Sequence, residues 1–273
     1  MHKKLVFLSM AAFFLLLIDG CSPKPYNATN KVYRQQTRAF AKQLRMEPSN
    51  PLNDTIQQPP YWVGTTNFGI RKPNFVIIHH TAQNSCEQTL QTFTLKRTAV
   101  SAHYVICKDG TVHHMLNDYL RAQHAGVSRW GNLIDINSSS IGIELDNNGF
   151  EPFDSLQLNS LISVLAKLKK DYTIPTANFI GHGDIAPTRK NDPNFRFPWK
   201  KLAENGFGLW FDENREEVPV GFNPIQALRI VGYDVKDTTA AIRSFKRHFL
   251  QDTTRQLNDV DRSVLYNLQK KYM

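Results

Sequence analysis

Two separate stretches of the sequence contain side chains of the types that bind a metal ion. Residues 179–193, F-I-G-H-G-D-I-A-P-T-R-K-N-D-P, begin as a short apolar strand and continue as a polar loop that cannot form a core. His182 and Asp192 lie ten positions apart within this loop. A loop that folds back on itself can bring both side chains to one ion, but two ligands are too few for tight zinc binding.

His79 is the best candidate for a third ligand, because it ends the apolar strand predicted for residues 75–78. Three protein ligands with an open fourth position are typical of a catalytic zinc site rather than a structural one. His80 is adjacent, and successive side chains of a strand point to opposite faces, so only one of the two should reach the metal. The residues alone leave the choice between His79 and His80 open.

The composition indicates a folded, basic protein. The 273 residues are enough for one main domain and a small second one, and 41% of them are hydrophobic. The formal net charge of +9 suits an anionic partner such as nucleic acid, anionic lipid or bacterial cell wall. Because the sequence has no Arg-rich arm and no interleaved basic and aromatic stripe, we expect no nucleic-acid partner.

Residues 1–20 are predicted to be a lipoprotein signal peptide. A positive start precedes an apolar run, residues 5–18, that is too short to span a bilayer comfortably. The following L-I-D-G-C resembles a bacterial lipobox, although Asp19 stands where a small residue is usual. We expect a lipid on Cys21 and a location on the periplasmic side of a membrane, with Ser22 permitting the outer membrane. The alternatives are an uncleaved anchor or an ordinary signal peptide with an incidental cysteine.

Hydrophobic periodicity predicts a mixed α/β layer fold, a central sheet flanked by helices, after a tether and N-terminal extension over residues 21–69. The Lys108-Asp109-Gly110 turn predicts a hairpin. Strands are predicted at residues 75–78, 102–107, 111–116, 140–145 and 179–181. Helices are predicted weakly at 31–44, from a cap at Ser85 to about 98, and at 155–172.

A charged stretch at residues 212–217, followed by V-P-V-G, is interpreted as a linker between a domain at 70–210 and a second at 221–273. Helix-start and helix-stop residues predict a small three-helix bundle beyond it. Its helices run from Asn223-Pro224 to Gly232, from Asp237 or Thr238 onward, and from about residue 259 to 272.

If Cys21 carries a lipid, Cys86 and Cys107 are the two remaining cysteines. In an exported protein they can form a disulfide, and as members of regular elements they can equally be buried free thiols. The sequence leaves both states open.

Several motifs, in order, resemble the type-2 family of N-acetylmuramoyl-L-alanine amidases, which includes the peptidoglycan recognition proteins. The resemblance covers roughly residues 74–206 and rests on I-I-H-H-T-A, S-A-H-Y, Q-H-A-G, S-I-G-I-E-L, G-H-G-D-I-A-P and R-K-N-D-P. The C-terminal A-I-R-S-F-K-R-H-F is similar to the helical peptidoglycan-binding module of AmiD-type lipoprotein amidases.

The resemblance implies that His79, His182 and Asp192 bind Zn²⁺, and it favours His79 over His80. Glu144 matches the acidic residue of the S-I-G-I-E motif, and Lys190 matches the lysine two residues before the last ligand. Zinc lowers the pKa of its water to about 7. A carboxylate off the metal can take the proton and pass it to the leaving amine. A lysine, or the zinc, can stabilise the tetrahedral oxyanion.

These residues predict a zinc amidase that cuts between N-acetylmuramic acid and L-alanine in peptidoglycan or muropeptides, with no obligate protein partner. The alternative is a non-catalytic peptidoglycan-binding lipoprotein, and a weaker one is a wall anchor in which only the C-terminal module matters. His124 is interpreted as either a substrate contact or a structural residue. His103 is expected to brace the fold, and Asp184 to orient the loop or a ligand histidine.

Overall fold

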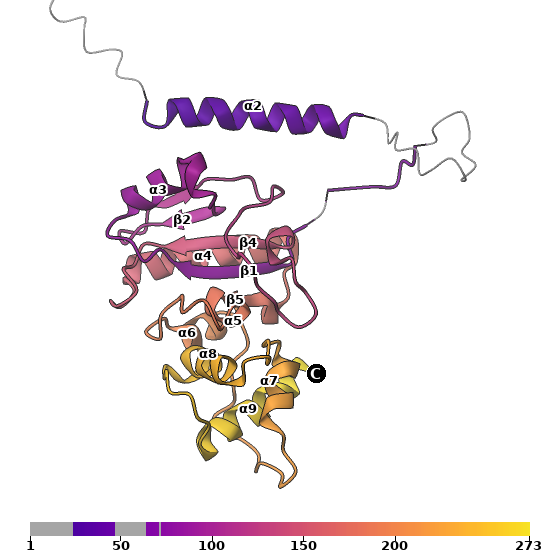
Figure 1. The fold of residues 1–273 in the computed structure, drawn as a ribbon, viewed down its shortest axis with the longest axis vertical. Coiled ribbons are helices and arrows are strands. Elements are labelled where there is room, and N and C mark those ends of the chain that lie inside the picture. The colour runs from indigo at the N-terminus through magenta and orange to yellow at the C-terminus, as the bar shows by residue number, and fades with distance from the viewer. Residues whose placement is uncertain (1–23, 47–63, 71) are drawn as a thin grey trace, which may run out of the picture. The chain divides into compact units, whose positions relative to one another are not determined.

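The structure is a computed structural model that describes residues 24–46, 64–70 and 72–273 (Figure 1). The chain divides into two compact units, Met1–Phe68 and Gly69–Met273. The predicted signal peptide and Cys21 lie outside the described residues. Within the part of the chain that is described, no helix combines the length and apolar character needed to cross a bilayer.

The first unit contains helix α2 (Asn27–Leu44), which starts four residues earlier than the sequence predicts. None of its side chains is buried. Lys31, Arg34, Arg38 and Lys42 follow one another at spacings of three and four residues, which places them on one side of the helix, and the helix contains no acidic residue. The result is an exposed helix with a continuous basic stripe.

The second unit is built on the predicted mixed sheet. Its strands are β1 (Phe75–His80), β2 (Tyr104–Ile106), β3 (Val112–His114), β4 (Ser140–Leu145) and β5 (Phe179–Gly181), in the order β3-β2-β4-β1-β5. Only the β2–β3 hairpin is antiparallel. Parallel pairing of β1 with β4 sets His79 opposite Glu144, so the register brings two predicted site residues side by side.

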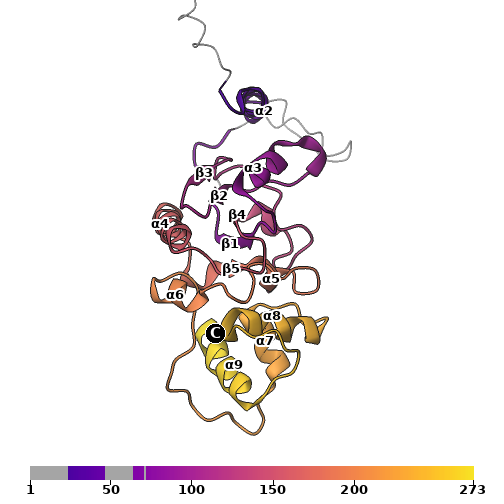
Figure 2. The same ribbon diagram turned by 90° about the vertical axis from the view of Figure 1, so that its left-hand side faces the viewer.

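Alternation along β1 and β4 gives the sheet two different faces. Val76 and Ile78 belong to a core with helix α4 (Ser155–Tyr172), whose leucines at helical spacing cover that face. Figure 2 shows α4 on this side of the sheet. Ile77 belongs to a second core on the opposite face, and His79 shares its direction because side chains alternate along a strand.

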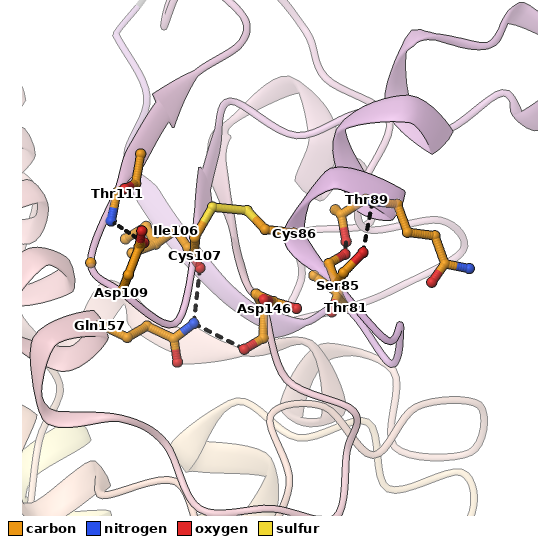
Figure 3. The surroundings of a disulfide bond; sticks show 12 residues. Thr81, Ser85, Cys86, Thr89, Ile106, Cys107, Asp109, Thr111, Asp146 and Gln157 are labelled. Carbon is orange, nitrogen blue, oxygen red and sulfur yellow. Dashed lines mark hydrogen bonds between the residues drawn. A yellow bond between two sulfur atoms is a disulfide. The ribbon is translucent and has the colours of Figure 1, made fainter.

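The structure joins the two cysteines that the sequence left undecided. Cys86 opens helix α3 (Cys86–Thr94) and Cys107 follows β2, and a disulfide links them across a Cα–Cα distance of 5.3 Å (Figure 3). Beside it, the Gln157 side chain donates to the carbonyls of Ile106 and Asp146. The segment that follows β1 is therefore tied covalently to the end of β2, the strand on the far side of β4.

Three helices form the C-terminal region: α7 (Pro224–Val231), α8 (Thr238–Leu250) and α9 (Asp259–Tyr272). Asn223 and Asp237 cap the first two as the sequence predicts. These helices share the second core with Ile77 of β1 and Ile180 of β5. The division into two domains stays a prediction, but the helices pack directly on the sheet unit.

Two short helices were not predicted. Helix α5 (His182–Ile185) lies inside the loop that follows β5, and α6 (Trp199–Glu204) follows Pro198. Figure 1 shows both between the sheet and α8. Both contact α8, in addition to the core that the C-terminal helices share with β1 and β5.

Candidate metal centre

His79, His182 and Asp192 meet at one buried point. His79 is the fifth residue of β1, His182 is the first residue of α5 directly after β5, and Asp192 lies on the returning loop. His79 Nδ1 lies 2.9 Å from His182 Nδ1, and Asp192 Oδ2 lies 3.1 Å and 3.0 Å from these two nitrogens. All three residues are buried, and their ligand atoms form a group that could hold a metal ion.

The hydrogen-bond chain behind His79 fixes which of its nitrogens carries the proton. The Ser140 hydroxyl donates to the Ile136 carbonyl at 2.7 Å, so it has no proton left and accepts from His124 Nε2 at 3.1 Å. His124 Nδ1 is then an acceptor and takes the Nε2–H of His79 at 3.1 Å. This leaves the Nδ1 lone pair of His79 pointing at the site.

A hydrogen bond also selects the tautomer of neutral His182. Its Nε2 donates to the Ala125 carbonyl at 3.1 Å, so in the neutral ring Nδ1 carries the lone pair that faces the site. Burial, followed by the charge of His182, lowers the pKa of His79 to about 4, so the ring of His79 is neutral near pH 7.

Two nitrogen lone pairs and a carboxylate oxygen that face each other repel unless a cation lies between them. A tetrahedral zinc with bonds of roughly 2.0–2.2 Å separates its ligand atoms by about 3.3 Å. The separations of 2.9–3.1 Å seen here are close to this spacing. The donor set and its protonation therefore fit a zinc-like cation, and His124 with Ser140 is an outer layer of the kind that orients metal-binding histidines.

Glu144 stands beside this group without belonging to it. Its Oε1 lies 3.9 Å from His79 Nδ1, and its buried Oε2 has no hydrogen-bond partner among the described residues. Burial, followed by the charge of Asp192, raises the pKa of Glu144, and the charge of Lys190 partly opposes this rise. The net pKa is about 8. Strongly shifted carboxylates gather at functional sites. The structure thus places Glu144 beside the candidate ligands, and the charge of Lys190 acts on both Glu144 and His79.

His80 lies on the other face of β1, as strand alternation requires. Its Nδ1 accepts the backbone N–H of Asn194 at 3.1 Å, and it is not among the residues that converge on the site. Of the two adjacent histidines, the geometry brings His79 to the metal centre.

His103 and His124 both have structural contacts. His103 accepts from the Gly142 N–H through Nδ1 and donates to the Leu120 carbonyl through Nε2, which agrees with the bracing role expected of it. His124 is 8% exposed, and both of its nitrogens have protein partners. Of the two roles that the sequence left open for His124, the structure favours the structural one.

Sequence reasoning missed Ser140 and the part of His124 in setting the tautomer of His79. The serine opens the S-I-G-I-E motif, four residues before Glu144, so the motif contains it, but its partner lies sixteen residues away in the sequence. A contact of this kind follows from the fold and not from local spacing.

Residues 69–195 match the family model described as N-acetylmuramoyl-L-alanine amidase. The N-acetylmuramoyl-L-alanine amidase AmiD of Escherichia coli (strain K12) is 32% identical over 206 residues, which cover 64% of this chain and 74% of that protein. The 1,6-anhydro-N-acetylmuramyl-L-alanine amidase AmpD of Enterobacter cloacae is 39% identical over 104 residues, or 38% of this chain and 56% of the relative.

Two solved structures resemble the fold over most of its length. A complex of the E. coli AmiD with anhydro-N-acetylmuramic acid-L-Ala-D-gamma-Glu-L-Lys has a TM-score of 0.68 and 27% identity, covering 80% of this chain and 97% of that one. AmpDh3 of Pseudomonas aeruginosa in complex with anhydromuramic pentapeptide has a TM-score of 0.68 and 28% identity, with coverages of 81% and 99%.

The sheet, the buried His-His-Asp group and these matches define a hydrolase of the type-2 amidase fold. The chain belongs to the N-acetylmuramoyl-L-alanine amidase family, and within it the chain is AmiD-like. It is an enzyme of that class, and the non-catalytic alternative is set aside.

Proposed function

We propose that this chain is a zinc-dependent N-acetylmuramoyl-L-alanine amidase that hydrolyses the amide between N-acetylmuramic acid and L-alanine. The observation that carries the proposal is the convergence of His79 Nδ1, His182 Nδ1 and Asp192 Oδ2, with the carboxylate of Glu144 at its side. These three atoms would hold the ion and leave a fourth position open. When bound, zinc supplies Lewis-acid polarisation and activates water near neutral pH.

The chain's own residues would move the proton and hold the developing charge. Glu144 takes a proton from the attacking water and delivers it to the nitrogen of the leaving L-alanine, which balances the hydrolysis as an acid and an amine. Its position 3.9 Å from His79 Nδ1 and its buried Oε2, which has no hydrogen-bond partner among the described residues, support this role. Lys190 would stabilise the negative charge that develops on the carbonyl oxygen.

The substrates we propose are muropeptides, with anhydro-muropeptides and intact peptidoglycan as the two forms. The AmiD and AmpDh3 structures were solved with anhydromuramyl peptides, and this chain matches nearly the whole of both. The C-terminal helices, by their sequence resemblance, are proposed to bind peptidoglycan. The biological process would be cell-wall turnover or recycling.

Digestion of purified sacculi and of an anhydro-muropeptide, with products read by mass, tests this function. We expect release of stem peptides that begin with L-alanine, loss of release after chelation, and recovery on adding zinc. The Glu144→Gln variant is the control for adventitious hydrolase, because it should retain zinc and lose turnover. Full activity in a metal-free preparation would contradict the zinc assignment.

The protein is further proposed to be lipid-anchored through Cys21 on the periplasmic side of the outer membrane. The lipobox-like sequence supports this, and so does the basic stripe of α2 a few residues later, since basic residues near a membrane are attracted to anionic headgroups. Cys21→Ser should release the protein from the membrane fraction or leave it unprocessed. A variant that is processed and fractionates like the wild type would remove the lipobox interpretation.

A further inference from the structure

One face of α8 lies against the turn that carries His182. Ser244, Arg247 and His248 occupy positions i, i+3 and i+4 of the helix, so their side chains share a face, and all three are buried. Figure 1 shows α8 next to α5 and α6. We call the surface formed by these three residues the α8 face.

The α8 face forms hydrogen bonds with two consecutive residues of α5. The Ser244 hydroxyl donates to the Gly183 carbonyl at 2.7 Å, and His248 Nδ1 donates to Asp184 Oδ2 at 2.7 Å. Arg247 closes over the same turn: a Cβ built on Gly183 would lie 2.6 Å from Arg247 Nη1. The turn is therefore held to α8 by polar contacts on that side.

Asp184 is the residue in which these contacts meet. Its Oδ2 also accepts the backbone N–H of Gly181 at 2.8 Å, and its Oδ1 accepts the Tyr233 hydroxyl at 3.0 Å. One buried carboxylate thus connects the end of β5, the segment after α7 and helix α8.

The turn held in this way positions two of the three candidate ligands. His182 is the first residue of the turn, directly before Gly183. The N–H of Gly183 donates to the carbonyl of Asp192 at 2.6 Å, so the backbone of the other ligand is tied to the same turn. A shift of the turn would move His182 and Asp192 relative to His79, which belongs to β1.

His248 is itself held in a fixed orientation. Its ring is stacked on the Trp199 indole of α6, with centroids 3.9 Å apart and planes 10° from parallel. A donor locked by stacking loses little further freedom on binding the carboxylate, so it can hold Asp184 in one geometry.

We infer that His248 is a positioning residue for the metal centre, and that the C-terminal helical module completes that centre as well as binding cell wall. The inference rests on the proposed zinc site. Outer hydrogen-bond partners of metal ligands are typically worth roughly 10–100-fold in metal affinity or activity. His248 acts one step further out, through Asp184 and the turn that carries His182, so loss of its donor should weaken zinc binding and turnover by about 10-fold, the lower end of this range.

The test uses the full chain and measures zinc affinity by chelator competition, the visible spectrum of the cobalt-substituted protein, and kcat and KM. His248→Ala should weaken metal binding about 10-fold, alter the cobalt spectrum, and lower kcat more than KM changes. His248→Asn, whose amide nitrogen takes the place of Nδ1, should recover most of the affinity. Phe245→Leu, a buried apolar residue of the same helix that has no donor to give to Asp184, controls for loss of stability alone.

Equal zinc affinity and an unchanged cobalt spectrum in His248→Ala and Phe245→Leu would overturn the inference. If His248→Ala does not fold, Tyr233→Phe is the second variant, because it removes one hydroxyl donor to Asp184. It is also expected to lower zinc affinity. Wild-type zinc affinity in Tyr233→Phe would overturn the inference as well. A wild-type chain that binds no zinc would instead refute the proposed function, so the two failures are distinguishable.

Discussion

The ring of His124 lies against Gly142, so closely that a Cβ at position 142 would fall 2.4 Å from its Cγ. Gly142 is the central residue of the S-I-G-I-E motif, and its neighbours Ser140 and Glu144 point to the same face of the sheet. The glycine is needed for space, because the histidine that fixes the proton on His79 occupies the position of its missing side chain.

Gly142→Ala should therefore disturb the metal centre indirectly, by moving the His124 ring that orients His79. The added methyl must displace the His124 ring, which costs about 1–3 kcal/mol of stability as overpacking and removes the partner of His79 Nε2. We expect zinc affinity to fall roughly 10–100-fold. Gly221→Ala is the matched control, since nothing lies within 4 Å of its Cβ position. Unchanged zinc affinity in Gly142→Ala would contradict the orienting role of His124.

His182→Ala and Asp192→Ala should each lose zinc and activity together, because each removes one of three ligand atoms. His80→Ala is the comparison within the same strand. It removes an acceptor of the Asn194 N–H and should lower stability while zinc remains bound. Metal content by mass spectrometry checks all three variants. Full zinc occupancy in both ligand variants would be incompatible with the assignment.

Glu144→Ala should separate catalysis from metal binding. The residue lies outside the three ligands, so zinc content and fold should persist, while loss of proton transfer should lower kcat by roughly 10²–10⁴ with KM little changed. Because Glu144 Oε2 is buried and has no partner in the part of the chain that the structure describes, its removal should not lower the melting temperature. A stable, zinc-loaded variant with near-normal turnover would exclude Glu144 from the mechanism.

The C-terminal helices contain an ion cluster that makes stability depend on acid pH. Buried Lys246 pairs with Asp252 and Asp261 at 2.8 Å and 2.7 Å. The hydrogen bond from Lys246 holds the pKa of Asp252 below its ordinary value of 3.8. A depressed carboxylate contributes stability above its unfolded pKa and loses it as pH falls through the folded pKa.

The melting temperature should accordingly fall as pH drops below about 4, and Asp252→Asn should reduce that fall. Thermal melts between about pH 3 and about pH 6 measure it. Asp171→Asn, which breaks the exposed pair with Lys167, is the control and should leave the acid dependence nearly unchanged. An identical acid dependence in the wild type and Asp252→Asn would assign the loss of stability to other groups.

Much of the fold was predictable from local pattern. The strand at Ser140–Leu145 and the helix at Ser155–Tyr172 have the predicted bounds, because continuous apolar character and leucines at helical spacing are strong signals. Strand β1 is two residues longer than predicted, since His79 and His80 continue the pairing with β4 despite their polarity. The helices α5 and α6 were not predicted, because they are too short to show a repeating pattern of apolar residues.

The candidate site was predictable in its residue types but not in its connections. His182 and Asp192 could be chosen because their types and the loop pattern match metal binding, whereas the choice of His79 over His80 needed the family resemblance. The chain from Ile136 through Ser140 and His124 to His79 depends on strand register and loop packing, which local sequence does not encode. The same holds for His248, which reaches Asp184 from 64 residues away.

The core shared by the sheet and the C-terminal helices has a thermodynamic consequence. Trp130 fills the space over Gly232, where a Cβ would lie 2.3 Å from its indole, and Ile77 of the sheet lies in the same apolar cluster as Leu228. Elements that share a core unfold cooperatively, so residues 69–273 should melt in one calorimetric transition. By linkage, any molecule that binds the folded C-terminal helices then stabilises the whole unit, the metal centre included. Attachment to the cell wall would protect the catalytic residues against unfolding even where it touches none of them.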